Sequence, residues 1–152
     1  MSRQSFGALS LDLPSDWEDQ SLLTFIKRPK GRMATAAVQD MTRNLVINRI
    51  PADGSFTAED LADLHFDSLR ASIPDLEVLR EESLEVLGAP AVLKEVSFST
   101  PTKGVAQQLQ VFVVLEELAL SCVGTGNAGM AFQTLRKDVL GILDSLELEG
   151  GA

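Results

Sequence analysis

A chain of 152 residues with 45 % apolar and 23 % charged residues has the composition of one folded domain, which needs neither disulfides nor a metal to bury a core. Its net charge of -9 repels phosphate backbones and anionic lipid headgroups, and this excludes nucleic acid as a partner. The single cysteine, Cys122, allows no intrachain disulfide and fits a reducing cytoplasm.

The amino-terminal stretch contains no apolar run of the kind that a signal peptide requires, and no run approaches the roughly 20 apolar residues that span a bilayer. We therefore expect a cytoplasmic protein without a leader and without stable insertion into a membrane. We expect one domain over residues 1–149 and a flexible tail over residues 150–152.

The first third of the chain predicts strands. Apolar and polar residues alternate over residues 6–13, which is typical of a half-buried strand. Residues 21–27 predict a second strand and residues 35–41 a shorter one. Residues 44–50 predict a further strand because they are rich in β-branched side chains.

A helix is predicted next, over residues 57–73. Thr57 is a suitable N-cap, and Asp60 stands where the partner in a capping box would stand. Pro74 ends the helix. Its apolar stripe consists of Ala62, Phe66, Leu69 and Ile73.

Strands return after this helix, and a second helix closes the chain over residues 130–146. The predicted strands are residues 78–80, 83–87, 92–99, 105–115 and 118–124. The short connections between them favour antiparallel neighbours. We therefore predict an α+β fold, an antiparallel β-sheet packed with two main α-helices.

Chemistry-bearing residues are scarce. His65 lies at the margin of the first helix's apolar stripe, and we interpret it as a structural histidine; Cys122 is interpreted as a buried hydrophobic residue. The glycine-rich residues 124–129 lack the lysine of a phosphate-binding loop and are predicted to be a strand-to-helix turn. We expect no metal, no cofactor and no enzymatic activity.

The strand over residues 105–115 changes character along its length. It begins with Gln107, Gln108 and Gln110 and continues with five apolar residues that point to both faces of the sheet. In one interpretation the glutamines are simply solvated and the doubly apolar part is covered on both sides. In the other, one face lines a groove for an apolar partner.

Two neighbouring segments favour the groove. Residues 22–26 carry large apolar side chains on both faces, and Ala119, Ser121 and Val123 are small enough to leave room above the sheet. Such a groove would bind an apolar segment at about 25 cal/mol per Å² of apolar surface removed from water.

Several motifs together resemble a known family. The stretches LDLPSDWEDQSLLTF, NLVINR, LGAPAVLKEVSF, QLQVFV and LALSCVGTG, with the closing helix, resemble the DcrB-related domain, which has a PsbP-like fold. Members without a leader include the effector-associated (Eag) chaperones of bacterial type VI secretion. The resemblance covers nearly the whole chain.

The resemblance implies a cytoplasmic homodimer from a Gram-negative bacterium. Such a chaperone holds the N-terminal transmembrane helices of an effector of the PAAR or Rhs type and helps to load it onto the VgrG spike. The residues that would bind this client are Leu22, Thr24, Ile26, Val46, Gln108 and Gln110. Thr24 departs from the family pattern, in which a branched apolar residue is expected at this position.

Two other hypotheses stay open at this point. The first is a general PsbP-like module for protein interaction, with no catalytic activity and no membrane-helix client. The second is a weak enzyme that uses His65.

Overall fold

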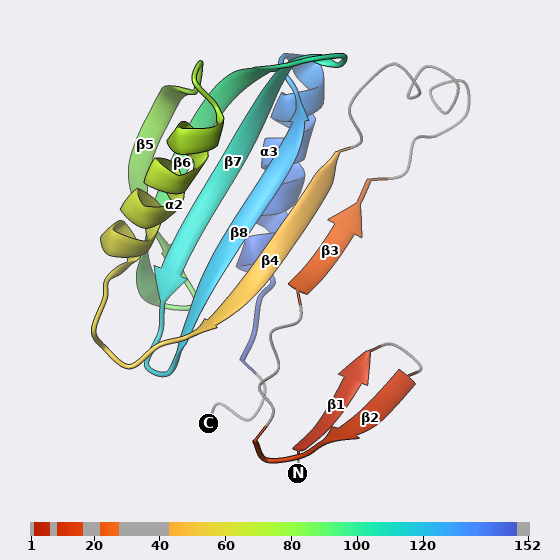
Figure 1. Ribbon diagram of the computed structural model, residues 1–152, viewed down its shortest axis with the longest axis vertical. Coiled ribbons are helices and arrows are strands. Elements are labelled where there is room, and N and C mark those ends of the chain that lie inside the picture. Colours follow the sequence, from red (N-terminus) through yellow and green to blue (C-terminus); the bar gives the residue numbers. More distant parts are fainter. Residues whose placement is uncertain (1, 7–8, 17–21, 28–42, 149–152) are drawn as a thin grey trace.

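The computed structural model describes residues 2–6, 9–16, 22–27 and 43–148 (Figure 1). Six strands form one antiparallel sheet in the order β3-β4-β8-β7-β6-β5. These strands are β3 (Leu22–Ile26), β4 (Asn44–Pro51), β5 (Glu77–Val86), β6 (Ala89–Thr100), β7 (Gly104–Val114) and β8 (Leu118–Asn127). The helices are α2 (Ala58–Ser72) and α3 (Met130–Asp144), so the predicted α+β fold is confirmed.

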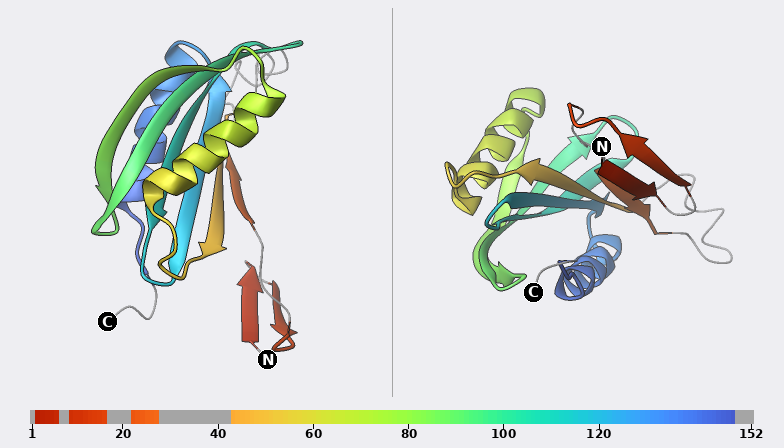
Figure 2. Two further views of the ribbon diagram at one scale, coloured as in Figure 1. Left: turned by 60° about the vertical axis from the view of Figure 1, so that its left-hand side comes forward. Right: turned by 90° about the horizontal axis from the view of Figure 1, so that it is seen from below.

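The two helices cover opposite faces of this sheet (Figure 2). Helix α2 packs on β6 and β7, whereas α3 packs on β8 and, less extensively, on β7. The larger part of the core lies on the α3 side, where Phe132, Leu135 and Val139 of the helix are buried against the sheet. A smaller cluster on the α2 side joins Ala62 to Phe112.

Strand β7 is apolar on both faces because α3 packs on one of them and α2 on the other. Val111 and Val113 belong to the core under α3, and Phe112 between them belongs to the cluster under α2. All three side chains are at most 1 % exposed. The interpretation that this stretch is covered on both sides is therefore correct.

The capping box that the sequence predicts at the start of α2 is confirmed. The Thr57 amide donates to the Asp60 carboxylate over 3.0 Å, and the Asp60 amide donates to the Thr57 hydroxyl over 3.2 Å. These two bonds satisfy amides that have no partner within the helix. The helix ends with the Ile73 amide donating to the Leu69 carbonyl, just before Pro74.

Three strand predictions need correction or lie outside the described residues. The strand predicted over residues 6–13 is wrong at its start, because Phe6 ends β1 (Ser2–Phe6) and Leu9–Leu13 form β2, its partner in a separate two-stranded sheet. The strands predicted over residues 78–80 and 83–87 are one strand, β5, with a bulge between Val78 and Arg80. Residues 35–41, like the tail at 150–152, lie outside the described residues.

The prediction of a strand-to-helix turn over residues 124–129 is also wrong in its first part. Strand β8 continues to Asn127, with Gly124 and Gly126 inside it. Helix α3 lies so close to this strand that a Cβ atom on Gly124 would be 3.0 Å from Val139 Cγ2. These glycines therefore permit close packing between strand and helix, and they do not mark a turn.

Glycine substitutions at two positions near α3 are expected to have opposite effects. Gly124→Ala should lower the free energy of unfolding by about 1–2 kcal/mol, because the new methyl group overpacks the contact with Val139. Gly141→Ala should raise it by about 0.5–1 kcal/mol, because Gly141 lies inside α3 and a Cβ added there would meet no atom within 4 Å. Urea unfolding measures both, and equal effects would contradict this account of the packing.

Candidate functional site

On the side of the sheet where α2 lies, this helix covers only some of the strands. Among the described residues, no helix packs on this side of β3, β4 and β8 (Figure 1). We call this surface, with the adjoining side chains of Gln108 and Gln110 on β7, the open face. The strand register brings residues from four strands together on it.

The register aligns the side chains of the open face in rows that run across the strands. One row consists of Thr24, Val46, Val123 and Gln110. A second row consists of Ile26, Asn44, Thr125 and Gln108. A third begins with Leu22, Asn48 and Ser121 and ends at Phe112, under α2.

All six residues predicted to bind a client therefore lie on the same side of the sheet. The sequence could predict this for pairs within one strand, because alternate residues share a face. It could not align β3 with β7, which are separated by two other strands. Their role in binding stays a prediction.

The open face is exposed at β3, half-buried at β4 and buried at Gln110, near α2. Leu22 and Ile26 on β3 are 53 % and 61 % exposed, Val46 on β4 is half-buried, and Gln110 on β7 is fully buried. The face is thus most accessible and most apolar at β3, which is the edge strand among the strands that the structure describes.

The dimensions of the open face suit a helix. Four strands about 4.8 Å apart span about 14 Å, and three rows of alternate residues span about 13 Å along the strands. An α-helix with its side chains is about 10–12 Å across. One helix can therefore lie over the face against the flank of α2.

The two glutamines differ in a way that the sequence could not predict. The Gln110 side-chain amide donates to the Gln108 side-chain oxygen over 3.0 Å. Gln108 is half-buried, whereas Gln110 is fully buried and its Oε1 atom has no hydrogen-bond partner. The interpretation of these glutamines as simply solvated is therefore wrong for Gln110, because β7 runs beneath α2 at this point.

A buried cationic group lies beside Gln110. Lys94 of β6 pairs with Gln110 in the register and is 4 % exposed, with its Nζ atom 4.5 Å from the centre of the Phe66 ring. His65 precedes Phe66 on α2, and its ring lies 5.3 Å from the ring of Phe112 on β7. Burial lowers the pKa of His65, and the positive charge of Lys94 lowers it further. His65 is therefore neutral at pH 7.

Among the residues that the structure describes, His65 and Cys122 are not placed to act together in acid-base or nucleophilic chemistry. The His65 Nε2 atom is buried without a hydrogen-bond partner, and Cys122 lies on the other side of the sheet, in the core under α3. Burial raises the pKa of the Cys122 thiol to about 11, which keeps it protonated. Within the described residues, no three histidine, cysteine or acidic side chains are grouped closely enough to bind a metal ion.

The open face also contains residues that the sequence analysis did not select. Asn44 and Asn48 flank Val46 on the same side of β4, and Thr125 lies between Asn44 and Gln108 in its row. The alternation of residues around Val46 was the signal that could have identified both asparagines. The face is therefore a mixture of branched apolar and amide or hydroxyl side chains.

None of the helices in the described ranges is long and apolar enough to cross a membrane.

Comparison with known proteins agrees with this architecture. The crystal structure of PA94 from Pseudomonas aeruginosa, a protein of unknown function, superposes with a TM-score of 0.74 and 17 % sequence identity, over 98 % of this chain and 97 % of that chain. This similarity shows a shared fold. No curated protein matches the sequence. The family model of DcrB matches residues 9–145, which is most of the chain, and the protein therefore belongs to the DcrB family.

Proposed function

We propose that the protein is a chaperone that shields the N-terminal transmembrane helices of a type VI secretion effector, of the PAAR or Rhs type, and helps to load it onto the VgrG spike. The observation that carries this proposal is the open face, a sheet surface of helix width beside α2 that is exposed and mainly apolar at β3 and carries amide and hydroxyl side chains toward α2. The membership of the DcrB family and the resemblance to Eag chaperones support it.

The physical need for such a protein is direct. A segment of about 20 apolar residues aggregates in water or enters the wrong membrane unless something covers it. Leu22 and Ile26 offer apolar area for that purpose, since both are more than half exposed. Fully burying one such side chain contributes about 1.5–3 kcal/mol.

The polar residues of the open face suit a client that belongs in a membrane. Helices in lipid associate through small and polar side chains, and hydrogen bonds between them contribute about 0.6–2 kcal/mol each. Asn44, Asn48 and Gln108 are half-buried among apolar neighbours and carry amides that can donate and accept. They would pair with hydroxyl or carbonyl groups of the client helix.

The two edges of the sheet differ, and this difference supports a homodimer. The edge strand β5 contains Glu77, Arg80, Glu81 and Glu82 and has a bulge, features that protect an edge against pairing. The opposite edge strand, β3, has the sequence LLTFI and no charge, and all five of its residues are exposed. We propose that β3 is where a second copy of the chain meets the first, so that two open faces form one larger cup.

Catalysis is not part of the proposed function. His65 is neutral and no described residue orients its buried Nε2 atom, and the Cys122 thiol is protonated. The protein would act by covering apolar surface.

The test is co-purification with an effector whose N-terminal helices are present or deleted. We expect Leu22→Asp to weaken capture of the effector at least 10-fold, because it places an unpaired charge in the apolar contact. Leu23→Asp is the matched control, since Leu23 is adjacent, 43 % exposed and on the α3 side of the same strand. Leu23→Asp should retain binding.

Three outcomes would overturn parts of the proposal. Capture that persists after the effector's helices are deleted would favour a general interaction module. Equal losses from Leu22→Asp and Leu23→Asp would show that binding does not use the open face. Sedimentation equilibrium of the free protein measures its mass, and a monomer would remove the dimer.

A further inference from the structure

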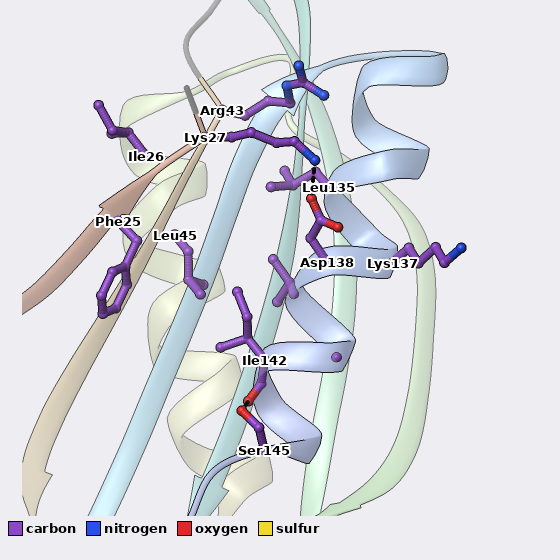
Figure 3. Close-up of a pocket in the computed structure, with 12 residues that line it drawn as sticks. Phe25, Ile26, Lys27, Arg43, Leu45, Leu135, Lys137, Asp138, Ile142 and Ser145 are labelled. Carbon is purple, nitrogen blue, oxygen red and sulfur yellow. Dashed lines mark hydrogen bonds and ion pairs between the residues drawn. The ribbon is translucent and has the colours of Figure 1, made fainter. Parts of the chain in front are cut away.

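A second concave surface lies on the α3 side of the sheet, between β3 and β4 on one side and α3 on the other (Figure 3). We call it the β3–α3 groove. Its volume is about 610 Å³, within the range of about 300–1,000 Å³ that is usual for small-molecule sites. Phe25 and Leu45 lie on the α3 side of their strands, so the groove does not share these side chains with the open face.

The walls of the groove are apolar along most of its length. Phe25 and Ile142 face each other across it and are 50 % and 40 % exposed, while Leu45, Leu135 and Val139 are buried at its base. Exposed aromatic and branched side chains on both walls favour an apolar ligand, because water gains no hydrogen bonds from them.

One end of the groove is charged. Lys27 Nζ lies 2.5 Å from the Asp138 carboxylate. The Lys27 backbone amide donates to the Arg43 carbonyl over 2.9 Å, so Arg43 adjoins Lys27, and its guanidinium extends beyond the Lys27 ammonium in Figure 3. The stem of Arg43 lies near Gly126, where an added Cβ would be 3.1 Å from Arg43 Cγ. The ammonium group of Lys137, by contrast, points away from the groove. Two cations therefore accompany one carboxylate at this end, in a protein whose net charge is -9.

We propose that the β3–α3 groove binds an anionic amphiphile with a single acyl chain, such as a long-chain fatty acid. The acyl chain lies between Phe25 and Ile142, and the carboxylate accepts hydrogen bonds from Arg43 and Lys27 at the charged end. Positive charge is in excess at this end of the apolar β3–α3 groove, and it therefore favours a ligand with an anionic head group.

The groove is too small to enclose a transmembrane helix. A helix of 20 residues is about 30 Å long and about 10 Å across, which corresponds to a cylinder of roughly 2,400 Å³. The groove has about a quarter of that volume. It lies on the other side of the sheet from the surface that we propose for an effector, and Ile26 of β3 borders both.

The experiment is titration of the full-length protein with cis-parinaric acid, a fluorescent fatty acid, and with its methyl ester. We expect the acid to bind with a dissociation constant in the micromolar range and the ester at least 3-fold more weakly. Arg43→Gln should weaken binding of the acid at least 3-fold and leave the ester unchanged. Ile142→Glu should weaken both at least 10-fold, because it places a charge on the apolar wall.

Two control variants locate the site. Leu64→Glu changes an apolar side chain on α2 that is 69 % exposed, and Leu22→Asp changes the open face; neither should alter binding of the acid. If the acid and the ester bind equally, or if Ile142→Glu binds as the wild type does, the proposal is wrong. Loss of binding in Leu22→Asp alone would place the probe on the open face. Circular dichroism verifies that each variant is folded.

Discussion

Replacing Arg136 with alanine is expected to lower the free energy of unfolding by about 3 kcal/mol. The Arg136 guanidinium of α3 donates two hydrogen bonds to the Glu95 carboxylate of β6, over 2.5 and 2.8 Å. Glu95 is 3 % exposed, so its carboxylate would remain in the core without a partner. Hydrogen bonding to Glu95 also raises the pKa of Arg136, because the carboxylate stabilises the charged guanidinium.

A double variant separates the cost of leaving the Glu95 carboxylate unpaired from the net contribution of the ion pair to stability. Replacing both residues with methionine removes the buried charge together with its partner, and it should restore most of the lost stability. Urea unfolding followed by circular dichroism measures the three proteins. A double variant as unstable as Arg136→Ala would show that the pair itself stabilises the contact between α3 and β6.

Replacing Gln110 with methionine is expected to raise the free energy of unfolding by about 1–3 kcal/mol. The substitution keeps the length of the side chain and removes an oxygen that is buried without a hydrogen-bond partner. Gln108 loses the amide that now donates to it, but it is half-buried and can bond to water instead. The side chain of Gln110 therefore lowers the free energy of unfolding of the free protein.

The same variant tests why Gln110 is present. If the effector's helix supplies the missing donor after a small shift of α2, Gln110→Met should be more stable and bind its client more weakly. Gln107→Met is the matched control, since Gln107 lies on the α3 side of the same strand. A variant that is more stable and binds equally well would show that Gln110 has no part in binding.

The sequence predicted the architecture well where local patterns determine it. The capping box at Thr57 and Asp60 and the alternation in β4, β7 and β8 are properties of adjacent residues, and the structure contains all of them. The extent of β8 was missed because glycines usually interrupt strands. At Gly124 a glycine is needed because α3 lies so close to the strand, and this contact joins residues that are far apart in the sequence.

The candidate sites were less accessible to sequence reasoning. The six residues expected on one face were chosen from a resemblance, and only the register of four strands shows that they lie together. The burial of Gln110 depends on where α2 lies over β7. The β3–α3 groove was not predicted at all, because its walls come from strands and a helix that are far apart in the chain.

The strand order has a consequence for synthesis on the ribosome. Strand β4 pairs with β8, the last strand of the sheet to be made, and within the described residues β3 pairs with β4 alone. Translation at about 5–20 residues per second needs about 4–15 s for the roughly 75 residues between the end of β4 and the end of β8. During that interval the apolar strands β3 and β4 have no sheet to join. The edge that carries the open face is therefore the last part of the sheet to pair with the other strands.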